Sequence, residues 1–355
     1  MSCLVSPDQF VPSGHPLRAI KPLVDQLLAD LSPLFDEMYA TMGRPSVPPE
    51  HLLKAMLLMA LFSVRSERQF CEQLGYNMLY RWFLDMDLMD RPFDPTVSTH
   101  NRERLLQHEV AAVFLQGTVA IARDRHLMSD DHFSVDGTLI EAWGSMKSFR
   151  PKDDDDGDNN GFADFKGTTR SNDTHESKTD PDARLFRKGR GREAKLAYMA
   201  HVLMENRHGL ICDFSLTTAT GTAEREAALD LATREQRRRR RRRSARRPRM
   251  TLGADKNYDT RDFVRQCRER VIAAHVAQFR HARRSSAIDG RTTRHRGYRM
   301  SQTARMRIEK IYGWMKTVAG FRRTRFRGCR KTAFAGTIAA TAYNLLRITK
   351  LQPAT

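Results

Sequence analysis

The hydrophobic pattern of this 355-residue chain changes near residue 130. From about 16 to 128 the apolar residues recur at helical spacing, and in "PEHLLKAMLLMALF" they surround the helix, as in a buried helix. Strand-like runs follow at 132–142, 194–205, 210–219 and 249–255. Helical segments are expected at 223–235, 260–270, 301–318 and 331–349. This order predicts an all-α segment followed by an α/β domain, in which helices cover a mixed sheet.

Two domains are therefore expected, 1–128 and 129–355, and two polar stretches interrupt the second. Residues 150–193 are polar and poor in aromatic residues, which predicts a long, partly disordered insertion. Residues 236–249 contain seven consecutive arginines, Arg237 to Arg243, which we interpret as a solvated basic linker. The alternative is that this run makes sequence-independent contacts with phosphates.

The charge of the chain points to an anionic partner. The formal net charge is +19, which favours a polyanion, most often nucleic acid, with an anionic membrane surface as the rival. The longest apolar run, 55–62, is far shorter than the ~20 residues of a membrane span, and the first residues show no signal pattern. Five scattered cysteines without a C-x-x-C pair fit a reducing compartment. We expect a cytoplasmic protein associated with the nucleoid.

The helical segment contains candidate DNA contacts. "SVRSERQFCEQLGYN" predicts a turn and a short helix with Ser66 as its N-cap, and a further helix is expected to begin near Ser98 or Thr99. Polar residues on the first turns of such helices could enter a DNA groove, as in a helix–turn–helix reader. These residues are Arg65, Arg68, Asn101, Arg102 and Arg104. A helical bundle with solvated charges fits the pattern equally well.

Two aspartates lie in apolar surroundings in the second domain. Asp136 is flanked on both sides by apolar residues in "FSVDGTLI", and Asp255 ends the run "MTLGAD". A buried strand acid is costly unless its charge is compensated, and a divalent metal compensates it. Alternatively, "VDGT" is a hairpin turn and Asp255 merely begins a loop. Asp259 is more simply the N-cap of a helix from Arg261. The acids at 153–156 and 158 lie in a polar loop, whereas metal sites favour rigid elements.

A third acid, Glu309, lies on an expected helix. On one ideal helix Arg305, Glu309 and Lys316 fall within about 40° of one another, at the rim of an apolar stripe. An ordinary ion pair between Arg305 and Glu309 is the simplest alternative. A strand acid, a strand-end acid and a helix glutamate, in that order in a basic protein, favour a ribonuclease-H-like nuclease core. There, three carboxylates hold two Mg²⁺ ions for attack on a phosphodiester.

These residues resemble the signature of a known family. Arg305, Glu309 and Lys316 match the last three positions of the YREK signature, and Gln302 occupies the tyrosine position. "VDGTLIEAW", "GADKNYDTRDF", "IDGRTTRHRGY" and "GWMKTVAGFRRTRFRG" are also similar to that family, as is "GRPSVPPEHLLKAMLL" to its helical N-terminal domain. The chain thus resembles the bacterial insertion-sequence DDE transposases, in the insertion-sequence-five branch.

The resemblance implies a function and a set of site residues. Asp136, Asp255 and Glu309 would be catalytic and would bind two Mg²⁺ ions, with Mn²⁺ as a substitute, while Arg305 and Lys316 would support them. Further DNA contacts would come from Lys256, Tyr258, Arg322, Arg323 and Arg325. The protein would bind terminal inverted repeats, cleave DNA strands and transfer them. Its partners would be double-stranded DNA, both transposon ends and target, and a second copy in a synaptic homodimer, with no membrane.

Three alternatives remain at this point. A catalytically silent DNA-binding regulator derived from a transposase would be expected to lack one acid, and all three are present. A metal-dependent nuclease without strand transfer would use the same three acids, so the sequence does not separate it from a transposase. An RNA-binding protein is less favoured, because the chain has no RNP-type aromatic motif.

Overall fold

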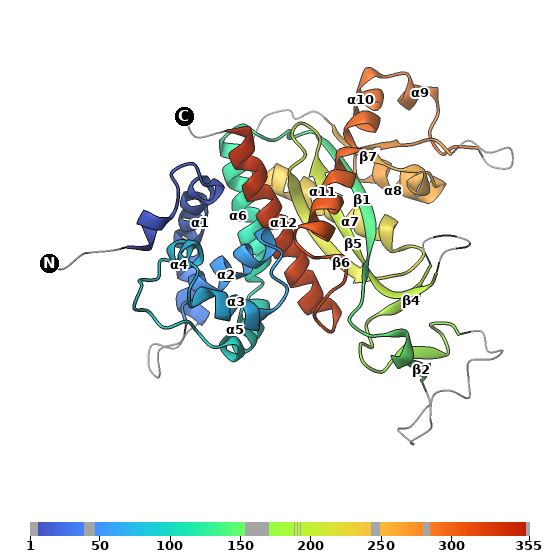
Figure 1. Cartoon of the computed structure of the whole chain (residues 1–355). Coiled ribbons are helices and arrows are strands. Elements are labelled where there is room, and N and C mark those ends of the chain that lie inside the picture. Colours follow the sequence, from blue (N-terminus) through green and yellow to red (C-terminus); the bar gives the residue numbers. More distant parts are fainter. Residues whose placement is uncertain are drawn as a thin grey trace. The chain divides into compact units, whose positions relative to one another are not determined.

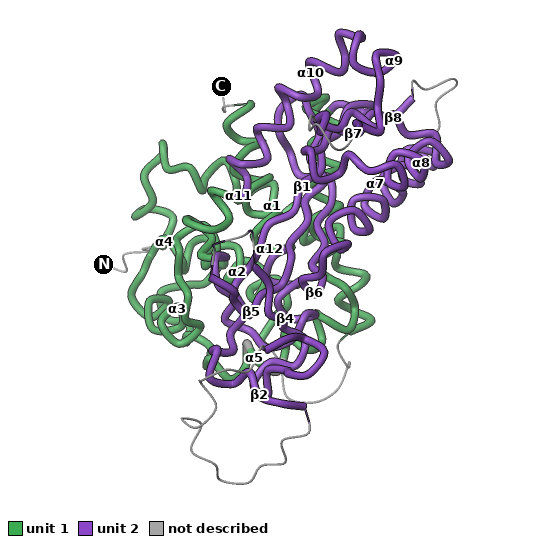
Figure 2. Tube along the Cα trace, turned by 90° about the vertical axis from the view of Figure 1, so that its right-hand side faces the viewer, with its two compact units in different colours: residues 1–128, 313–320, 337–355 green, residues 129–312, 321–336 purple. Residues whose placement is uncertain are grey.

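The computed structural model describes residues 6–38, 47–152, 170–187, 189, 191, 193–242, 249–279 and 285–352. The chain divides into two compact units (Figure 2). Unit 1 comprises residues 1–128, 313–320 and 337–355, and unit 2 comprises 129–312 and 321–336. The sequence predicts two contiguous segments instead. The difference arises because part of the C-terminal segment groups with the N-terminal helices.

Unit 1 is helical in the described residues. Its elements are η1 (Pro7–Phe10), α1 (Pro16–Met38), α2 (Pro49–Leu61), α3 (Glu67–Leu74), α4 (Met78–Phe83), α5 (Pro95–Gln107) and α6 (Val110–Asp124), with the ends of α11 (Arg307–Thr317) and α12 (Cys329–Leu351). The expectation that α2 is buried is confirmed, because Leu52, Leu53 and Leu57 are at most 1% exposed. Its one buried cation, Lys54, forms ion pairs with Asp25 and Asp85.

The start of α5 differs from the sequence expectation. Ser66 caps α3 as predicted, with its Oγ accepting from the Gln69 N–H at 3.3 Å. Asp94 caps α5, however, and Pro95 occupies its first turn, so the helix begins before Ser98. Aspartate is as good a cap as serine and proline favours the first helical turn, which explains the earlier start.

The long helix expected after Ser98 is two helices. α5 ends near Gln107, and Glu109 adopts a left-handed φ of 50° before α6 begins. No single helix in the described residues is long and apolar enough to cross a membrane. α5 and α6 reach that length and apolarity only when they are counted together across a 70° bend.

Unit 2 contains a mixed sheet, as predicted. Its strands are β1 (His132–Glu141), β4 (Arg184–Phe186), β5 (Lys195–Glu205), β6 (Ile211–Thr218), β7 (Met250–Ala254) and β8 (Ile272–Val276). The order is β4-β5-β1-β7-β8, with β6 also paired to β5. β1, β5 and β6 run antiparallel side by side (Figure 1), whereas β7 is parallel to β1 and β8 is parallel to β7. Strand β8 was not predicted.

Helices cover this sheet. They are α7 (Ala223–Arg241), α8 (Arg261–Glu269), α9 (Gly290–Thr293), α10 (Arg296–Ala304) and the first part of α11, with η3 (Lys256–Tyr258) after β7. α7 packs against β6, β5 and β1, whereas α10 packs against β7, β1 and β8. The single helix predicted at 301–318 is wrong, because the chain breaks between α10 and α11 near Arg305. The ideal-helix argument therefore does not extend across this break.

The described residues of the polar insertion form three short strands. β2 (Phe149–Pro151) follows η2 (Met146–Ser148) and pairs with β3 (His175–Ser177) in a small second sheet. β4 joins the main sheet through β5. The acids at 153–156 and 158 lie outside the described residues.

The basic linker expected at 236–249 is wrong for its first part. α7 continues to Arg241, and three arginines of the run bind acids within unit 2. Arg238 pairs with Asp213 at 2.9 Å, Arg239 pairs with Asp131, and Arg242 pairs with Glu235 at 2.7 Å. These acids reduce the repulsion between neighbouring arginines, so the helix can continue. Residues 243–248 lie outside the described residues.

Asp259 has a structural role other than the predicted one. Thr260 caps α8, whereas the buried Asp259 carboxylate accepts hydrogen bonds from the backbone N–H groups of Phe279 at 2.7 Å and Ala287 at 2.8 Å. In Asp259→Asn the amide NH₂ would face one of these donors. We expect this variant to lose about 1–3 kcal/mol of unfolding free energy in urea denaturation. An unchanged denaturation midpoint would contradict this role.

A candidate active site on two parallel strands

Asp136 lies within β1, and Asp255 directly follows Ala254, the last residue of the neighbouring strand β7. β1 and β7 pair in parallel with His132 opposite Thr251 and Ser134 opposite Gly253. If this pairing register is continued by two residues beyond Ser134 and Gly253, Asp255 comes opposite Asp136. β1 runs unbroken from His132 to Glu141 and pairs with β5 through Asp136 and Gly137, so "VDGT" is not a hairpin turn.

The surroundings of Asp136 disfavour its negative charge. Burial raises the pKa of the Asp136 carboxyl to about 7, and the charges of Asp255 and Glu224 also raise it. A hydrogen bond from the Gly137 N–H to Oδ1 at 2.8 Å and the charge of Arg305 act in the opposite direction. The site thus gathers negative charge at a poorly solvated position, and an added cation would stabilise it.

Glu224 belongs to these surroundings, although no sequence pattern marks it as a site residue. It lies in the first turn of α7, and a Cβ at Gly137 would be 2.9 Å from its Cγ and 3.0 Å from its Oε1. Acids are common in first helical turns because they interact favourably with the helix dipole, so sequence alone gives no reason to select this one. The only local signal is that Gly137 leaves space beside the strand acid.

Tyr258, predicted to contact DNA, is fully buried, and this prediction is corrected. Its hydroxyl has no hydrogen-bond partner among the described residues. Burial raises the pKa of Tyr258 well above its usual value, and the charges of Glu224, Asp136 and Asp255 act in the same direction. The ring packs against Phe263, with 5.4 Å between the ring centroids, and is not accessible to DNA.

Helix α11 is attached to β1 at Asp136. The Tyr312 hydroxyl donates to the carbonyl oxygens of Asp136 at 2.7 Å and Ala200 at 3.1 Å. Glu309, three residues earlier on the same helix, is exposed. The described ion pairs include none between Arg305 and Glu309. Instead, the Arg305 Nε donates to the Oε1 of Gln302 at 2.9 Å.

Gln302, at the position of the signature tyrosine, links this arginine to the sheet. Its Nε2 donates to the carbonyl oxygen of His275 on β8, while its Oε1 accepts from Arg305. The amide therefore holds the guanidinium near the end of α10, from which its charge reaches Asp136.

The two aspartates suit a hard divalent cation. Mg²⁺ in phosphate-processing sites is usually bound by one or two carboxylates together with substrate phosphates, and it keeps several waters. Asp136 and Asp255 supply such oxygen donors, and the raised pKa of Asp136 reflects first the burial of its carboxyl and then the charges of Asp255 and Glu224. Among the described residues, no three His, Cys, Asp or Glu side chains are close enough to form a metal-binding group. Glu309 thus belongs to no preformed cluster.

Two of the predicted DNA contacts in unit 1 are buried. Asn101 donates to the Val97 carbonyl at 3.0 Å, and Arg102 forms an ion pair with Glu67 at 2.6 Å. Both were expected on an exposed first turn, and the earlier start of α5 places them in its interior instead. The side chains of Arg65, Arg68 and Arg104 are exposed.

The other predicted basic residues lie in several places. Lys256, Arg322 and Arg323 are exposed, and Arg323 donates to the carbonyl oxygens of Ala142 at 3.2 Å and Trp143 at 2.9 Å. Arg325 lies over the Phe326 ring, 4.9 Å from its centroid. Lys316 is half-buried on the part of α11 that belongs to unit 1.

Comparisons with known proteins give matches to two family models. "Transposase domain (DUF772)" matches residues 5–104, and "Transposase DDE domain" matches residues 128–345. Among solved structures, a piggyBac transposase synaptic complex with hairpin DNA is 9% identical, with a TM-score of 0.42, and the match covers 95% of this chain and 76% of that one. A Mos1 transposase paired-end complex is 12% identical, with a TM-score of 0.21, over 66% of this chain and 62% of that one. No curated protein matches significantly.

Proposed function

The chain belongs to the family of transposases with a DDE domain, and we propose that it binds the terminal inverted repeats of its own insertion sequence. There it would cut DNA strands and join them to a target. The observation that carries this proposal is that Asp136 on β1 and Asp255, directly after the parallel neighbour β7, come together, with Asp136 in a poorly solvated environment that contains other acids.

We assign the catalytic and metal-binding roles to Asp136, Asp255 and Glu309. The two aspartates would hold metal on the sheet, and Glu309 would complete the site from α11, which Tyr312 attaches to the Asp136 backbone. Two Mg²⁺ ions, or Mn²⁺ in their place, would activate the attacking oxygen and neutralise charge on the phosphodiester. Arg305 would orient the scissile strand or the acids through charge-assisted contacts.

The finer classification also belongs to this proposal. Three antiparallel strands followed by two parallel ones, with one carboxylate on β1 and another directly after the adjacent β7, support a ribonuclease-H-like core. The resemblance of Arg305, Glu309 and Lys316 to a YREK signature supports the insertion-sequence-five branch. Gln302 would replace the tyrosine of that signature by holding Arg305 through a hydrogen bond.

We propose that DNA is contacted by both units. Unit 1 would recognise the transposon ends through exposed basic residues, and unit 2 would bind backbone phosphates. The residues retained for these contacts are Arg65, Arg68, Arg104, Lys256, Lys316, Arg322, Arg323 and Arg325. Because an element has two ends, a homodimer would hold both in a synaptic complex.

The proposal is tested with purified full-length protein and duplexes that carry the inverted repeats flanking its gene. With Mg²⁺ or Mn²⁺ we expect cleavage at the repeat ends and, with added target DNA, joined products on a sequencing gel. A duplex with scrambled repeats should not be cut at a defined position. Binding of ends without any cleavage would favour a silent regulator. Cleavage without joining would favour a nuclease.

A further inference from the structure

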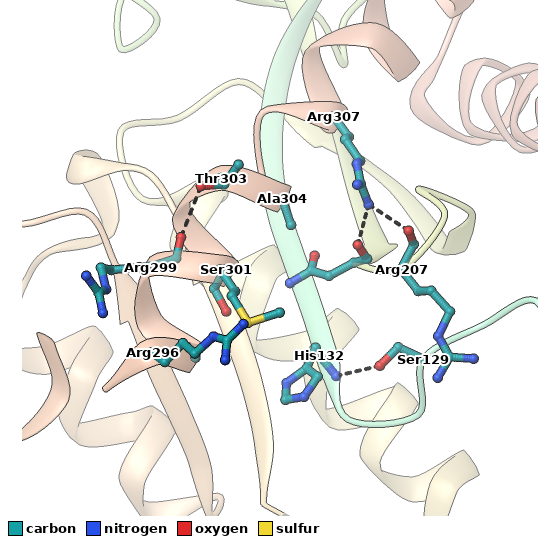
Figure 3. A pocket seen from close by; sticks show the side chains of 12 residues that line it. Ser129, His132, Arg207, Arg296, Arg299, Ser301, Thr303, Ala304 and Arg307 are labelled. Carbon is teal, nitrogen blue, oxygen red and sulfur yellow. Dashed lines mark hydrogen bonds between the residues drawn. The ribbon is translucent and has the colours of Figure 1, made fainter. Parts of the chain in front are cut away.

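A pocket of about 700 Å³ lies in unit 2 beside the start of β1 (Figure 3). Its walls come from β1, the turn between β5 and β6, α10 and the start of α11. Four arginines line it, Arg207, Arg296, Arg299 and Arg307, and the lining includes no aspartate or glutamate. The pocket is therefore a concave site of concentrated positive charge.

Two of the pocket arginines have less charge compensation than arginines on other helices of unit 2. On α7 and α8, arginines such as Arg234, Arg238 and Arg265 form ion pairs with acids. The side chains of Arg296 and Arg299, in contrast, form no hydrogen bond or ion pair with any other described residue. Such arginines carry five donors each and suit a phosphate.

Arg307 is held in place by the protein backbone. Its Nη1 donates to the carbonyl oxygens of Asn206 at 2.5 Å and Arg207 at 2.7 Å, as the dashed lines in Figure 3 show. Its Nε and Nη2 make no hydrogen bond within the described part of the chain. These donors are thus fixed in direction and available to an anion.

The pocket and the aspartates lie along the same strand. His132, which lines the pocket, is fixed by a 3.0 Å contact between its Nδ1 and the Thr251 Oγ1. Because side chains alternate along a strand, His132 and Asp136 project from the same face of β1, with Cα atoms about 13 Å apart. That separation equals the rise of about four nucleotides along one strand of a duplex.

We propose that this pocket binds backbone phosphates of the DNA whose cleavage takes place at Asp136 and Asp255. A polyanion fits a lining that contains four arginines and no aspartate or glutamate. Contact with the backbone is favoured over binding of a nucleobase, because His132 is the only aromatic ring in the lining and stacking platforms need such rings. The inference rests on the proposed function and adds a site outside the residues assigned above.

The first test measures how DNA affinity depends on salt. Each phosphate contact contributes about 0.9 to the slope of log affinity against log salt concentration. For Arg296→Ala/Arg299→Ala in the full chain, we expect the magnitude of this slope to fall by about one to two on a short duplex of arbitrary sequence. The matched control is Arg265→Ala/Arg268→Ala on α8, with the same loss of charge. Equal changes in both variants would mean that only total charge matters, and would overturn the proposal.

A second test needs no variant that could misfold. Phenylglyoxal modifies accessible arginines, and mass spectrometry locates the modified residues. We expect duplex DNA to protect Arg296 and Arg299 at least several-fold, and to leave Arg265 and Arg268 reactive. Inorganic phosphate at the same phosphate concentration should not protect them. Protection by phosphate as strong as that by DNA would indicate a small-anion site and overturn the proposal.

The same experiments separate this inference from the proposed function. If DNA protects Arg296 and Arg299 but the protein never cuts its repeat ends, the DNA-binding pocket is supported and the proposed enzymatic activity is contradicted. If the protein cuts and joins repeat ends, yet Arg296 and Arg299 stay reactive in the presence of DNA, the proposed function is supported and the DNA-binding role of the pocket is contradicted.

Discussion

Asp136→Asn and Asp255→Asn are each expected to lower metal-dependent strand cleavage by more than about a hundredfold. Loss of a residue that merely orients a metal ligand already costs roughly 10- to 100-fold, so loss of a direct ligand should cost more. The amide keeps the shape of the side chain but lacks the anionic oxygen that a hard cation requires. The measurement is the single-turnover cleavage rate on repeat-end duplexes with Mg²⁺ and with Mn²⁺.

DNA binding should survive both substitutions. Removing a negative charge from a basic surface cannot weaken its attraction for phosphates, so gel-shift affinity should be unchanged or higher. The matched control is Asp230→Asn, which alters an exposed acid on α7 paired with Arg234 at 2.5 Å. This variant should cleave within about twofold of wild type, because exposed ion pairs contribute little. Full cleavage by either strand variant would remove that aspartate from the site.

The second large effect concerns the third carboxylate, and two glutamates compete for the role. Glu309 is the candidate from the signature on α11, whereas Glu224 is the acid whose side chain lies against Gly137 beside Asp136. We expect Glu309→Gln to reduce cleavage by more than about a hundredfold, like the two aspartates. Glu224→Gln should cost less than about tenfold, because glutamine preserves its packing against Gly137 and α11 still supplies the ligand.

Comparison of these two variants decides which helix completes the site. Cleavage rates should be measured over a range of Mg²⁺ concentrations, because loss of a ligand also raises the metal concentration needed for half-maximal rate. Circular dichroism checks that both variants fold. If Glu224→Gln is inactive while Glu309→Gln cleaves normally, the third carboxylate lies on α7 and the signature-based assignment is wrong.

Sequence patterns predict most of this sheet for a clear physical reason. β1, β5, β6 and β7 are rich in apolar residues and bounded by polar turns, so burial selects the strand state. β8 was missed because "IAAHV" is short and rich in alanine, which is a poor strand former, and only pairing with β7 defines it.

Fewer residues of the candidate site could be predicted from the sequence, because they come from segments that are far apart in the chain. The two aspartates could be found since each is an acid in an apolar run. Glu224 resembles any first-turn acid until the sheet brings Gly137 beside it. Arg102 resembles a DNA contact until its partner Glu67 is known, and the arginines of the pocket come from two separate stretches, 207 and 296–307.

Helix α10 connects the arginine-lined pocket to Arg305, whose charge acts on Asp136. Gly253 has no side chain, and a Cβ there would be 3.4 Å from the Ser301 carbonyl oxygen, so the helix lies close to β7. Arg296 is at its first residue and Arg305 caps its last turn, about 14 Å away along a rigid rod. Hydrogen bonds from the Tyr298 hydroxyl to the Val276 carbonyl oxygen at 3.0 Å and between His275 and Ser301 at 2.8 Å also hold α10 to β8. The helix therefore acts as a spacer that keeps the arginine-lined pocket and Arg305 at a constant separation.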